Sequence, residues 1–185
     1  MATTIQPLEL EGIYLVRPRI FPDSRGFFFE TFKESEFHNA GLKVHFVQEN
    51  HSSSSKGVLR GLHYQRAPKA QGKLVRVLSG AIFDVVVDMR EESPTCGKWL
   101  GVELSAENRH QLYVSPGFAH GFCVLSDQAE ITYLVTEEYS PGDEGGVAWN
   151  DPFINVSWPC QEPAVSDKDR QWGPFAPLPK SIWRG

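Results

Sequence analysis

The chain has 185 residues, of which 41% are hydrophobic and 12% aromatic, and its formal net charge is −5 at pH 7. This length and composition predict one domain over residues 1–185 with a full core. The negative charge argues against nucleic acid as a partner, so any anion site must be local. The three cysteines lack metal-type spacing, the N-terminus lacks a signal-peptide pattern, and no apolar run is long enough to span a membrane. We therefore expect a cytoplasmic protein without a membrane partner.

Short strands bounded by turn residues dominate the chain, which predicts an all-β sandwich or small barrel. The expected strands span residues 12–17, 25–30, 44–51, 58–65, 72–78, 81–89, 99–104, 111–114, 118–125 and 130–137. A short helix is expected at 33–40, before Gly41. Loops are expected at 17–24, 52–57 and 139–146. An irregular C-terminal tail over 150–185 should pack on the domain, and its charge cluster at 166–170 is typical of a solvated surface.

The segment 60–65 places a histidine among strand-forming residues, with charged residues on both sides. An isolated histidine there is equally consistent with a packed core imidazole and with a catalytic base. Strict alternation would put Arg60 and His63 on opposite faces of the strand. The two side chains share a site only if Gly61 permits a bulge, which glycine in a strand often marks, or if the site lies at a strand end.

Other residues on neighbouring strands favour a pocket with acid–base chemistry. Lys73 and His120, if they lie close to Arg60 and His63, would make a cationic pocket that also moves protons. Asp84 interrupts an apolar strand, so its carboxylate needs a histidine or arginine partner across the sheet. The hydroxyl of Tyr133 would need a partner if buried, which makes this residue a candidate acid.

Six motifs together resemble one known family in their order and spacing. They are RGFFFE at 25–30, QEN at 48–50, RGLHYQ at 60–65, PGFAHGF at 116–122, Tyr133 followed by YSP at 139–141, and SDKD at 166–169. The set closely resembles the dTDP-4-dehydrorhamnose 3,5-epimerase family. This resemblance implies a cupin-type jelly-roll β-sandwich with short peripheral helices, and a homodimer. It also implies an isomerase without cofactor or metal that epimerises C3 and C5 of dTDP-4-dehydro-6-deoxy-α-D-glucose, giving dTDP-4-dehydro-β-L-rhamnose for dTDP-L-rhamnose synthesis.

The resemblance carries roles to individual residues. His63 matches the general base and Asp169 the carboxylate that orients it. Tyr133 matches the acid, and Lys73 matches the cation beside the C4 oxygen, where negative charge develops. Tyr139 matches the residue that stacks on thymine. The remaining matches, all nucleotide-sugar contacts, are Arg25, Glu30, Gln48, Asn50, Arg60, His120, Glu144 and Lys168.

Three other functions are alternatives to this one. An enzyme that epimerises only C3 or only C5 would keep nearly the same residues. A metal-dependent cupin is poorly supported, because Gln65 stands where a second histidine ligand would be and no carboxylate ligand is evident. A non-catalytic sugar-nucleotide-binding module would not need a base opposite an acid.

Overall fold

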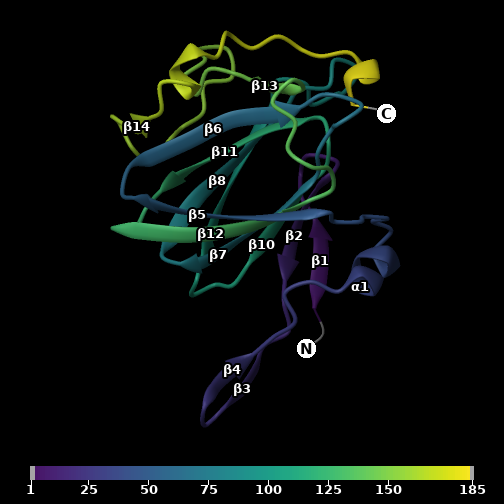
Figure 1. The fold of residues 1–185 in the computed structure, drawn as a ribbon, viewed down its shortest axis with the longest axis vertical. Coiled ribbons are helices and arrows are strands. Elements are labelled where there is room, and N and C mark those ends of the chain that lie inside the picture. The colour runs from purple at the N-terminus through teal and green to yellow at the C-terminus, as the bar shows by residue number, and fades with distance from the viewer. Residues whose placement is uncertain (1–2, 184–185) are drawn as a thin grey trace.

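The computed structural model describes residues 3–183, which form two facing β-sheets (Figure 1). The first sheet has the strand order β1 (Thr4–Pro7), β2 (Ile13–Arg17), β10 (Gln111–Val114), β7 (Lys73–Ser79), β12 (Gln128–Val135) and β5 (Gln48–Ser55). The second has the order β13 (Glu144–Gly146), β6 (Val58–Gln65), β11 (Phe118–Val124), β8 (Ala81–Asp88) and β9 (Trp99–Ser105), and β14 (Ala164–Val165) pairs with β6. The predicted all-β jelly-roll sandwich is confirmed.

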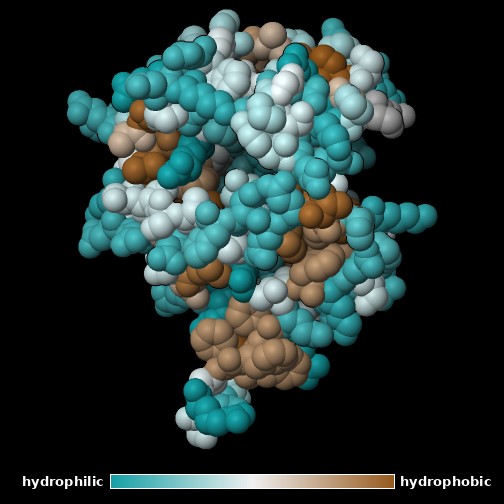
Figure 2. All heavy atoms as spheres, viewed as in Figure 1, coloured by the Kyte–Doolittle hydropathy of each residue, from teal (hydrophilic) through white to brown (hydrophobic). Residues whose placement is uncertain are grey.

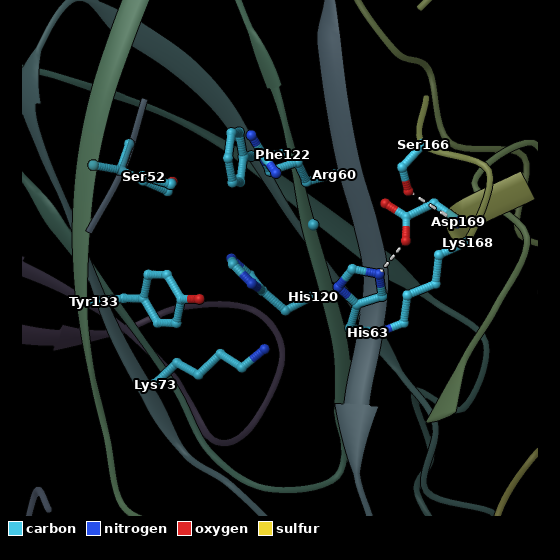
Figure 3. Close-up of a pocket in the computed structure, with 12 residues that line it drawn as sticks. Ser52, Arg60, His63, Lys73, His120, Phe122, Tyr133, Ser166, Lys168 and Asp169 are labelled. Atoms are coloured by element: carbon cyan, nitrogen blue, oxygen red, sulfur yellow. Dashed lines mark hydrogen bonds and ion pairs between the residues drawn. The ribbon is translucent and has the colours of Figure 1, made fainter. Parts of the chain in front are cut away.

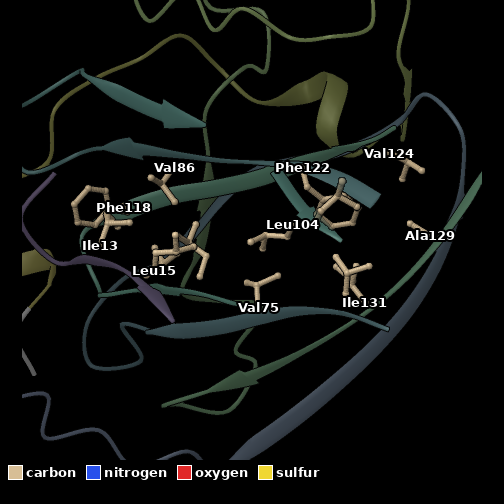
Figure 4. Close-up of a cluster of buried hydrophobic side chains, with 14 of the residues drawn as sticks. Ile13, Leu15, Val75, Val86, Leu104, Phe118, Phe122, Val124, Ala129 and Ile131 are labelled. Carbon is tan, nitrogen blue, oxygen red and sulfur yellow. The ribbon is translucent and has the colours of Figure 1, made fainter. Parts of the chain in front are cut away.

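The main hydrophobic core fills the space between the two sheets (Figure 4). Strand alternation sends every second side chain inward, so Val75 and Ile131 of the first sheet meet Val86 and Phe122 of the second. Burial of these side chains supplies the main driving force that holds the layers together. The two sheets therefore form a stable frame for polar side chains placed between them.

The C-terminal segment covers the outer face of the second sheet (Figure 1). Buried residues of the sheet, among them Val85 and Ala119, pack there against Trp158 and Phe175 of that segment. The segment contains β14 and two short 3-10 helices, η1 (Asp169–Gln171) and η2 (Lys180–Ile182). Its path brings η1 next to β6.

Several boundaries differ from the sequence predictions. The strand expected at 44–51 begins and ends later, as β5, and includes the serine run that was expected to be a loop. All eight residues of β5 pair with β12, so a backbone ladder and not apolar alternation defines this edge strand. In the expected loop at 139–146, β13 pairs with β6. In the expected turn at 17–24, β3 (Phe21–Asp23) pairs with β4 (Gly26–Phe28).

The predicted helix is α1 (Glu34–Asn39), which lies beside the first sheet (Figure 1). Its buried residue, Phe37, packs with Val44 and with Tyr113 of β10. The helix therefore covers part of the outer face of the first sheet. Within residues 3–183, no helix has the length and apolar character needed to cross a membrane.

The β3–β4 hairpin projects from the sandwich and carries exposed aromatic side chains. Phe27 and Phe28 are 55% and 65% exposed, and Phe21 is 41% exposed. Figure 2 shows a brown apolar patch at this position, with a hydrophilic tip beyond it. These phenylalanines therefore lie outside the core of this chain and form an exposed apolar patch.

Candidate active site

A bulge in β6 brings Arg60 and His63 to the same cavity. His63 lies opposite His120 of β11 and Arg60 lies opposite Phe122, so β6 has one more residue than β11 between these pairs. Gly61 makes this possible with a φ of +129°, and a Cβ on it would lie 2.5 Å from the Cα of Gly121. The condition set by the sequence, a bulge at Gly61, is met.

His63 is held by a carboxylate from the other end of the chain (Figure 3). Its Nε2 lies 2.6 Å from Oδ1 of Asp169, and the backbone N–H of Gly61 donates to Oδ2 at 3.2 Å. Burial alone would raise the pKa of the Asp169 carboxyl, but the hydrogen bond and charge of His63 hold this pKa below its usual value. Asp169 is 4% exposed, so the expectation of a solvated charge cluster is wrong for this residue.

A second histidine–carboxylate pair lies beneath the same cavity. Nε2 of His120 is 2.8 Å from Oδ1 of Asp84, and both side chains are buried. Asp84 therefore has the cross-strand histidine partner that its burial required. Its other oxygen, Oδ2, is buried without a hydrogen-bond partner among the described residues.

Lys73 extends from the first strand of the β7–β8 hairpin into this cavity (Figure 3). Burial lowers the pKa of its ammonium group from 10.5 to about 8, although the charges of Asp84 and Glu144 act in the opposite direction. The ammonium is thus poorly hydrated and stands ready to interact with a negatively charged atom in the cavity. An ammonium group in this environment would stabilise the negative charge of an enolate oxygen.

Tyr133 stands on the wall opposite His63. It belongs to β12 of the first sheet, whereas His63 belongs to β6 of the second, and its hydroxyl points into the cavity (Figure 3). Burial raises the pKa of the Tyr133 hydroxyl, and the positive charge of Arg60 only partly opposes this effect. The hydroxyl is therefore protonated at neutral pH and has a proton to donate.

These residues surround an inner cavity of about 280 Å³. Its lining consists of Ser52, Arg60, His63, Lys73, His120, Gly121, Phe122, Ile131, Tyr133, Ser166, Lys168 and Asp169. Three of these side chains, Arg60, Lys73 and Lys168, are cations in a chain whose net charge is negative. The expected local basic pocket is therefore present.

An outer cavity of about 330 Å³ shares His63, Lys73, Tyr133 and Lys168 with the inner cavity. The other predicted contacts that line it are Gln48, Asn50, Tyr139 and Glu144. Because the two cavities share four lining residues, they adjoin, and together they form the cleft of this chain.

Hydrogen bonds fix the polar wall of the outer cavity. The hydroxyl of Tyr139 donates to Oε2 of Glu144 at 2.9 Å, and Nζ of Lys168 donates to the same oxygen at 2.5 Å. The side-chain oxygen of Gln48 accepts a bond from the backbone N–H of Tyr139 at 3.0 Å. Tyr139 is 51% exposed and lines the outer cavity, so part of its ring is accessible to a ligand there.

Two predicted contacts, Arg25 and Glu30, do not lie at either cavity. Arg25 is at the tip of the β3–β4 hairpin, where its guanidinium pairs with Asp23 at 2.6 Å and remains 88% exposed. Glu30 follows the hairpin and lies 3.6 Å from Lys33. Within the described residues of one chain, every other predicted site residue lines one of the two cavities.

Sequence reasoning missed several residues of the cleft. Ser52 and Phe122 line the inner cavity, and Ser166 lines it too while its hydroxyl accepts a bond from the backbone N–H of Asp169 at 3.1 Å. Gln65 holds the loop of the outer cavity, since its side-chain oxygen accepts from the backbone N–H of Ser140 at 2.9 Å. The spacing Ser166-x-x-Asp169 is a turn signal that could have identified the first of these bonds.

Among residues 3–183, no group of three His, Cys, Asp or Glu side chains is placed to hold a metal ion.

Comparison with known proteins places the chain in a family. The sequence profile described as dTDP-4-dehydrorhamnose 3,5-epimerase matches residues 7–177. The chain belongs to the dTDP-4-dehydrorhamnose 3,5-epimerase family. Its similarity to the enzyme of that name from Shigella flexneri is 57% identity over 162 residues, which cover 87% of this chain and 90% of the relative.

Solved structures of this family share the fold. The epimerase of Legionella pneumophila, in complex with dTDP-4-keto-L-rhamnose, aligns with a TM-score of 0.92 and 41% identity, covering 99% of this chain and 98% of that one. ChmJ of Streptomyces bikiniensis, a 3'-monoepimerase in complex with dTDP-quinovose, aligns with a TM-score of 0.89 and 36% identity, covering 94% and 92%. A double epimerase and a single epimerase therefore share the fold of this chain.

Proposed function

We propose that the protein converts dTDP-4-dehydro-6-deoxy-α-D-glucose to dTDP-4-dehydro-β-L-rhamnose by inverting C3 and C5, as a step towards dTDP-L-rhamnose. The observation that carries the proposal is the placement of His63, paired with Asp169, on one sheet and of Tyr133 on the facing sheet. Inverting a carbon next to a ketone requires removing a proton from one face and returning a proton to the other. A base and an acid on opposite walls meet that requirement.

In this mechanism His63 removes the proton, and Asp169 stabilises the imidazolium that forms. The C4 ketone acidifies both neighbouring carbons, so one site serves C3 and C5 without a cofactor. Lys73 stabilises the oxygen that becomes negative as the proton leaves, because a poorly solvated ammonium interacts strongly with a nearby anion. Tyr133 then protonates the carbon from the opposite face.

The rest of the cleft binds the nucleotide sugar. Arg60, Lys168 and His120 supply positive or hydrogen-bonding groups for the diphosphate and the sugar. The exposed ring of Tyr139 stacks on thymine at the mouth, and Gln48, Asn50 and Glu144 supply polar contacts beside it. The cationic lining of the cleft, in a chain with a net charge of −5, supports an anionic ligand of limited size.

The active form in this proposal is a homodimer whose sites are shared. Arg25 and Glu30 match contacts of the family but lie on or beside the projecting hairpin, away from the cleft of their own chain. A second copy of the chain would receive this hairpin, bury Phe27 and Phe28, and gain Arg25 as a ligand contact. The proposed dimer acts in the cytoplasm, with no nucleic acid or membrane as a partner.

Proton NMR of the substrate in deuterated water tests the proposal. The double epimerase incorporates deuterium at C3 and at C5 and yields the L-lyxo product. Exchange without any change in configuration, or no exchange at all, would overturn it. Protein purified without a histidine tag and treated with a chelator provides the control for a metal contribution.

A single-centre epimerase is the second candidate, favoured by the likeness to the monoepimerase ChmJ. The same NMR experiment separates the two. Deuterium with inversion at only one carbon assigns the protein to the single-centre class. In that case the roles of His63 and Tyr133 still hold, but only one orientation of the sugar ring is productive.

A further inference from the structure

Two thiols lie close together on the outer face of the second sheet. Sγ of Cys123 is 2.6 Å from Sγ of Cys160. Cys123 belongs to β11 and is fully buried. Its neighbour Phe122 points into the core between the sheets, so strand alternation turns Cys123 towards the C-terminal segment and away from the cleft.

The chain on both sides of Cys160 is fixed to this sheet. Upstream, the ring of Trp158 packs edge-on against Phe83, with 6.3 Å between the centroids. Downstream, Val165 of β14 pairs with Leu59 of β6. Phe83 and Leu59 are also the two residues that flank Cys123 in the register of β8 and β6. The proximity of the sulfurs is therefore set by strand pairing and ring packing, and does not depend on a loose loop.

We propose that Cys123 and Cys160 are a reversible thiol–disulfide site, oxidised by small disulfides of the glutathione type. A disulfide bond needs the sulfurs to approach by only roughly another half ångström. The third cysteine, Cys96, belongs to neither β11 nor the segment around Cys160, and it lines a separate surface cavity with Trp99 and Phe153. It therefore serves as an internal control.

The unequal exposure of the two thiols orders the reaction. Cys160 is partly exposed, so its thiolate meets the oxidant, attacks one sulfur of glutathione disulfide and releases one glutathione as thiolate. Cys123 then loses its proton to solvent, and its sulfur attacks the Cys160 sulfur and expels the second glutathione. Two protein thiols are oxidised to one disulfide, and one glutathione disulfide is reduced to two glutathione molecules.

Cys123 does not react with oxidants by itself. Burial, followed by the hydrogen bond and charge of Cys160, raises the pKa of the Cys123 thiol to about 12. The thiol therefore stays protonated at neutral pH, and it reacts only with a sulfur already held against it. This arrangement favours an internal disulfide over a stable adduct with glutathione.

The bond would tie β11 to the segment that leads to Asp169. It joins positions 37 apart in the sequence and closes a loop of that length in the unfolded chain. Such a cross-link stabilises the folded state by restricting the unfolded one. The oxidised protein should unfold at a temperature higher by roughly 5 °C or more.

The test uses the folded full-length protein, incubated with glutathione disulfide and then alkylated in denaturant. Intact mass before alkylation should show the loss of two hydrogen atoms, and peptide mapping after alkylation should find Cys123 joined to Cys160 with Cys96 alkylated. Dithiothreitol should restore three free thiols and the lower unfolding temperature. Cys96→Ser should behave like the wild type, whereas Cys160→Ser should form no internal disulfide and show no rise in unfolding temperature.

Three free thiols after oxidation, or a glutathione adduct on Cys160 that persists, would overturn the proposal. A disulfide that includes Cys96 would also overturn it. None of these readouts uses catalytic activity. The result therefore stands whether or not the protein proves to be an epimerase.

Discussion

His63 and Tyr133 lie on opposite sheets of the sandwich and both line the cavity between them. Because β6 and β12 belong to different sheets, a local change in the backbone of one strand would not bring both side chains to the same wall. The distance between base and acid is therefore set by the packing of the two sheets. This arrangement allows the two residues to be tested separately.

Replacing the base should stop proton removal. We expect His63→Ala to lower the rate of deuterium exchange at C3 and C5 by roughly 10²- to 10⁴-fold, because no other group would take the proton. NMR in deuterated water measures this rate. His45→Ala, at a histidine whose side chain is 81% exposed, should leave it unchanged. Retained exchange in His63→Ala would mean that another residue is the base.

Removing the acid should separate exchange from inversion. Tyr133→Phe keeps the ring but loses the hydroxyl, so proton removal by His63 should continue while return of a proton to the opposite face slows. We expect deuterium incorporation with retained configuration to exceed product formation, as measured by NMR of the two diastereomers. Inversion at the wild-type rate would remove Tyr133 from the mechanism.

Lys73 should give the enzyme a pH dependence near 8. With its pKa lowered to about 8, the ammonium loses its proton above that pH, so kcat/KM should fall about tenfold per pH unit on the alkaline side. The effect of the Lys73 pKa on folding stability has the opposite sign to its effect on activity. Between about 8 and 10.5 the unfolded chain holds the proton and the folded chain does not, so stability rises with pH in this window. Denaturant unfolding of wild type and Lys73→Met should differ in this slope, and a flat activity profile up to pH 10 would contradict the assignment.

The shared site predicts complementation between two inactive variants. Arg25→Ala should weaken substrate binding and His63→Ala should stop catalysis. If the hairpin of one chain serves the cleft of its partner, a mixed dimer contains one cleft with both defects and one intact cleft. Subunit exchange between the two variants should therefore restore part of the activity. Mixing Arg25→Ala with itself provides the control, and no recovery in verified mixed dimers would place Arg25 outside the partner's site.

Close contact between β6 and β11 should make Gly121 sensitive to substitution. A Cβ on Gly121 would lie 2.6 Å from the backbone oxygen of Arg60, and a backbone atom cannot move aside as the end of a flexible side chain could. We expect Gly121→Ala to destabilise the fold by about 1–3 kcal/mol and to reduce activity, because the strands that hold both histidines must separate. Gly142→Ala, where nothing lies within 4 Å, is the matched control. Equal unfolding midpoints for the two variants would contradict this account.

The sequence pattern predicted the sandwich and most of its strands because alternation and turn residues report directly on a two-layer β fold. It also identified Gly61 as the position where a bulge was needed, and Asp84 as a carboxylate in need of a partner. Composition alone did not predict the full extent of β5, since its serines carry no apolar alternation and the strand is defined by pairing with β12. These differences arise where long-range pairing overrides local signals.

Site residues that are far apart in the sequence were harder to predict than those on neighbouring strands. As part of a charged run, Asp169 had the pattern of a surface residue, and only its similarity to a family motif singled it out. Its burial depends on the path of the C-terminal segment over β6, which no local pattern encodes. The position of Arg25 is the converse case, because the motif assigned it to the ligand while the fold of one chain holds it away.

The hydrogen bond from His63 to Asp169 spans 106 positions of the chain, and this has a consequence for synthesis on the ribosome. A growing chain that has already exposed β6, β11 and β12 still lacks the carboxylate for its imidazole. Asp169 must leave the exit tunnel and dock before the pair exists. Catalytic competence would thus arise late in translation, after both layers of the sandwich have been made.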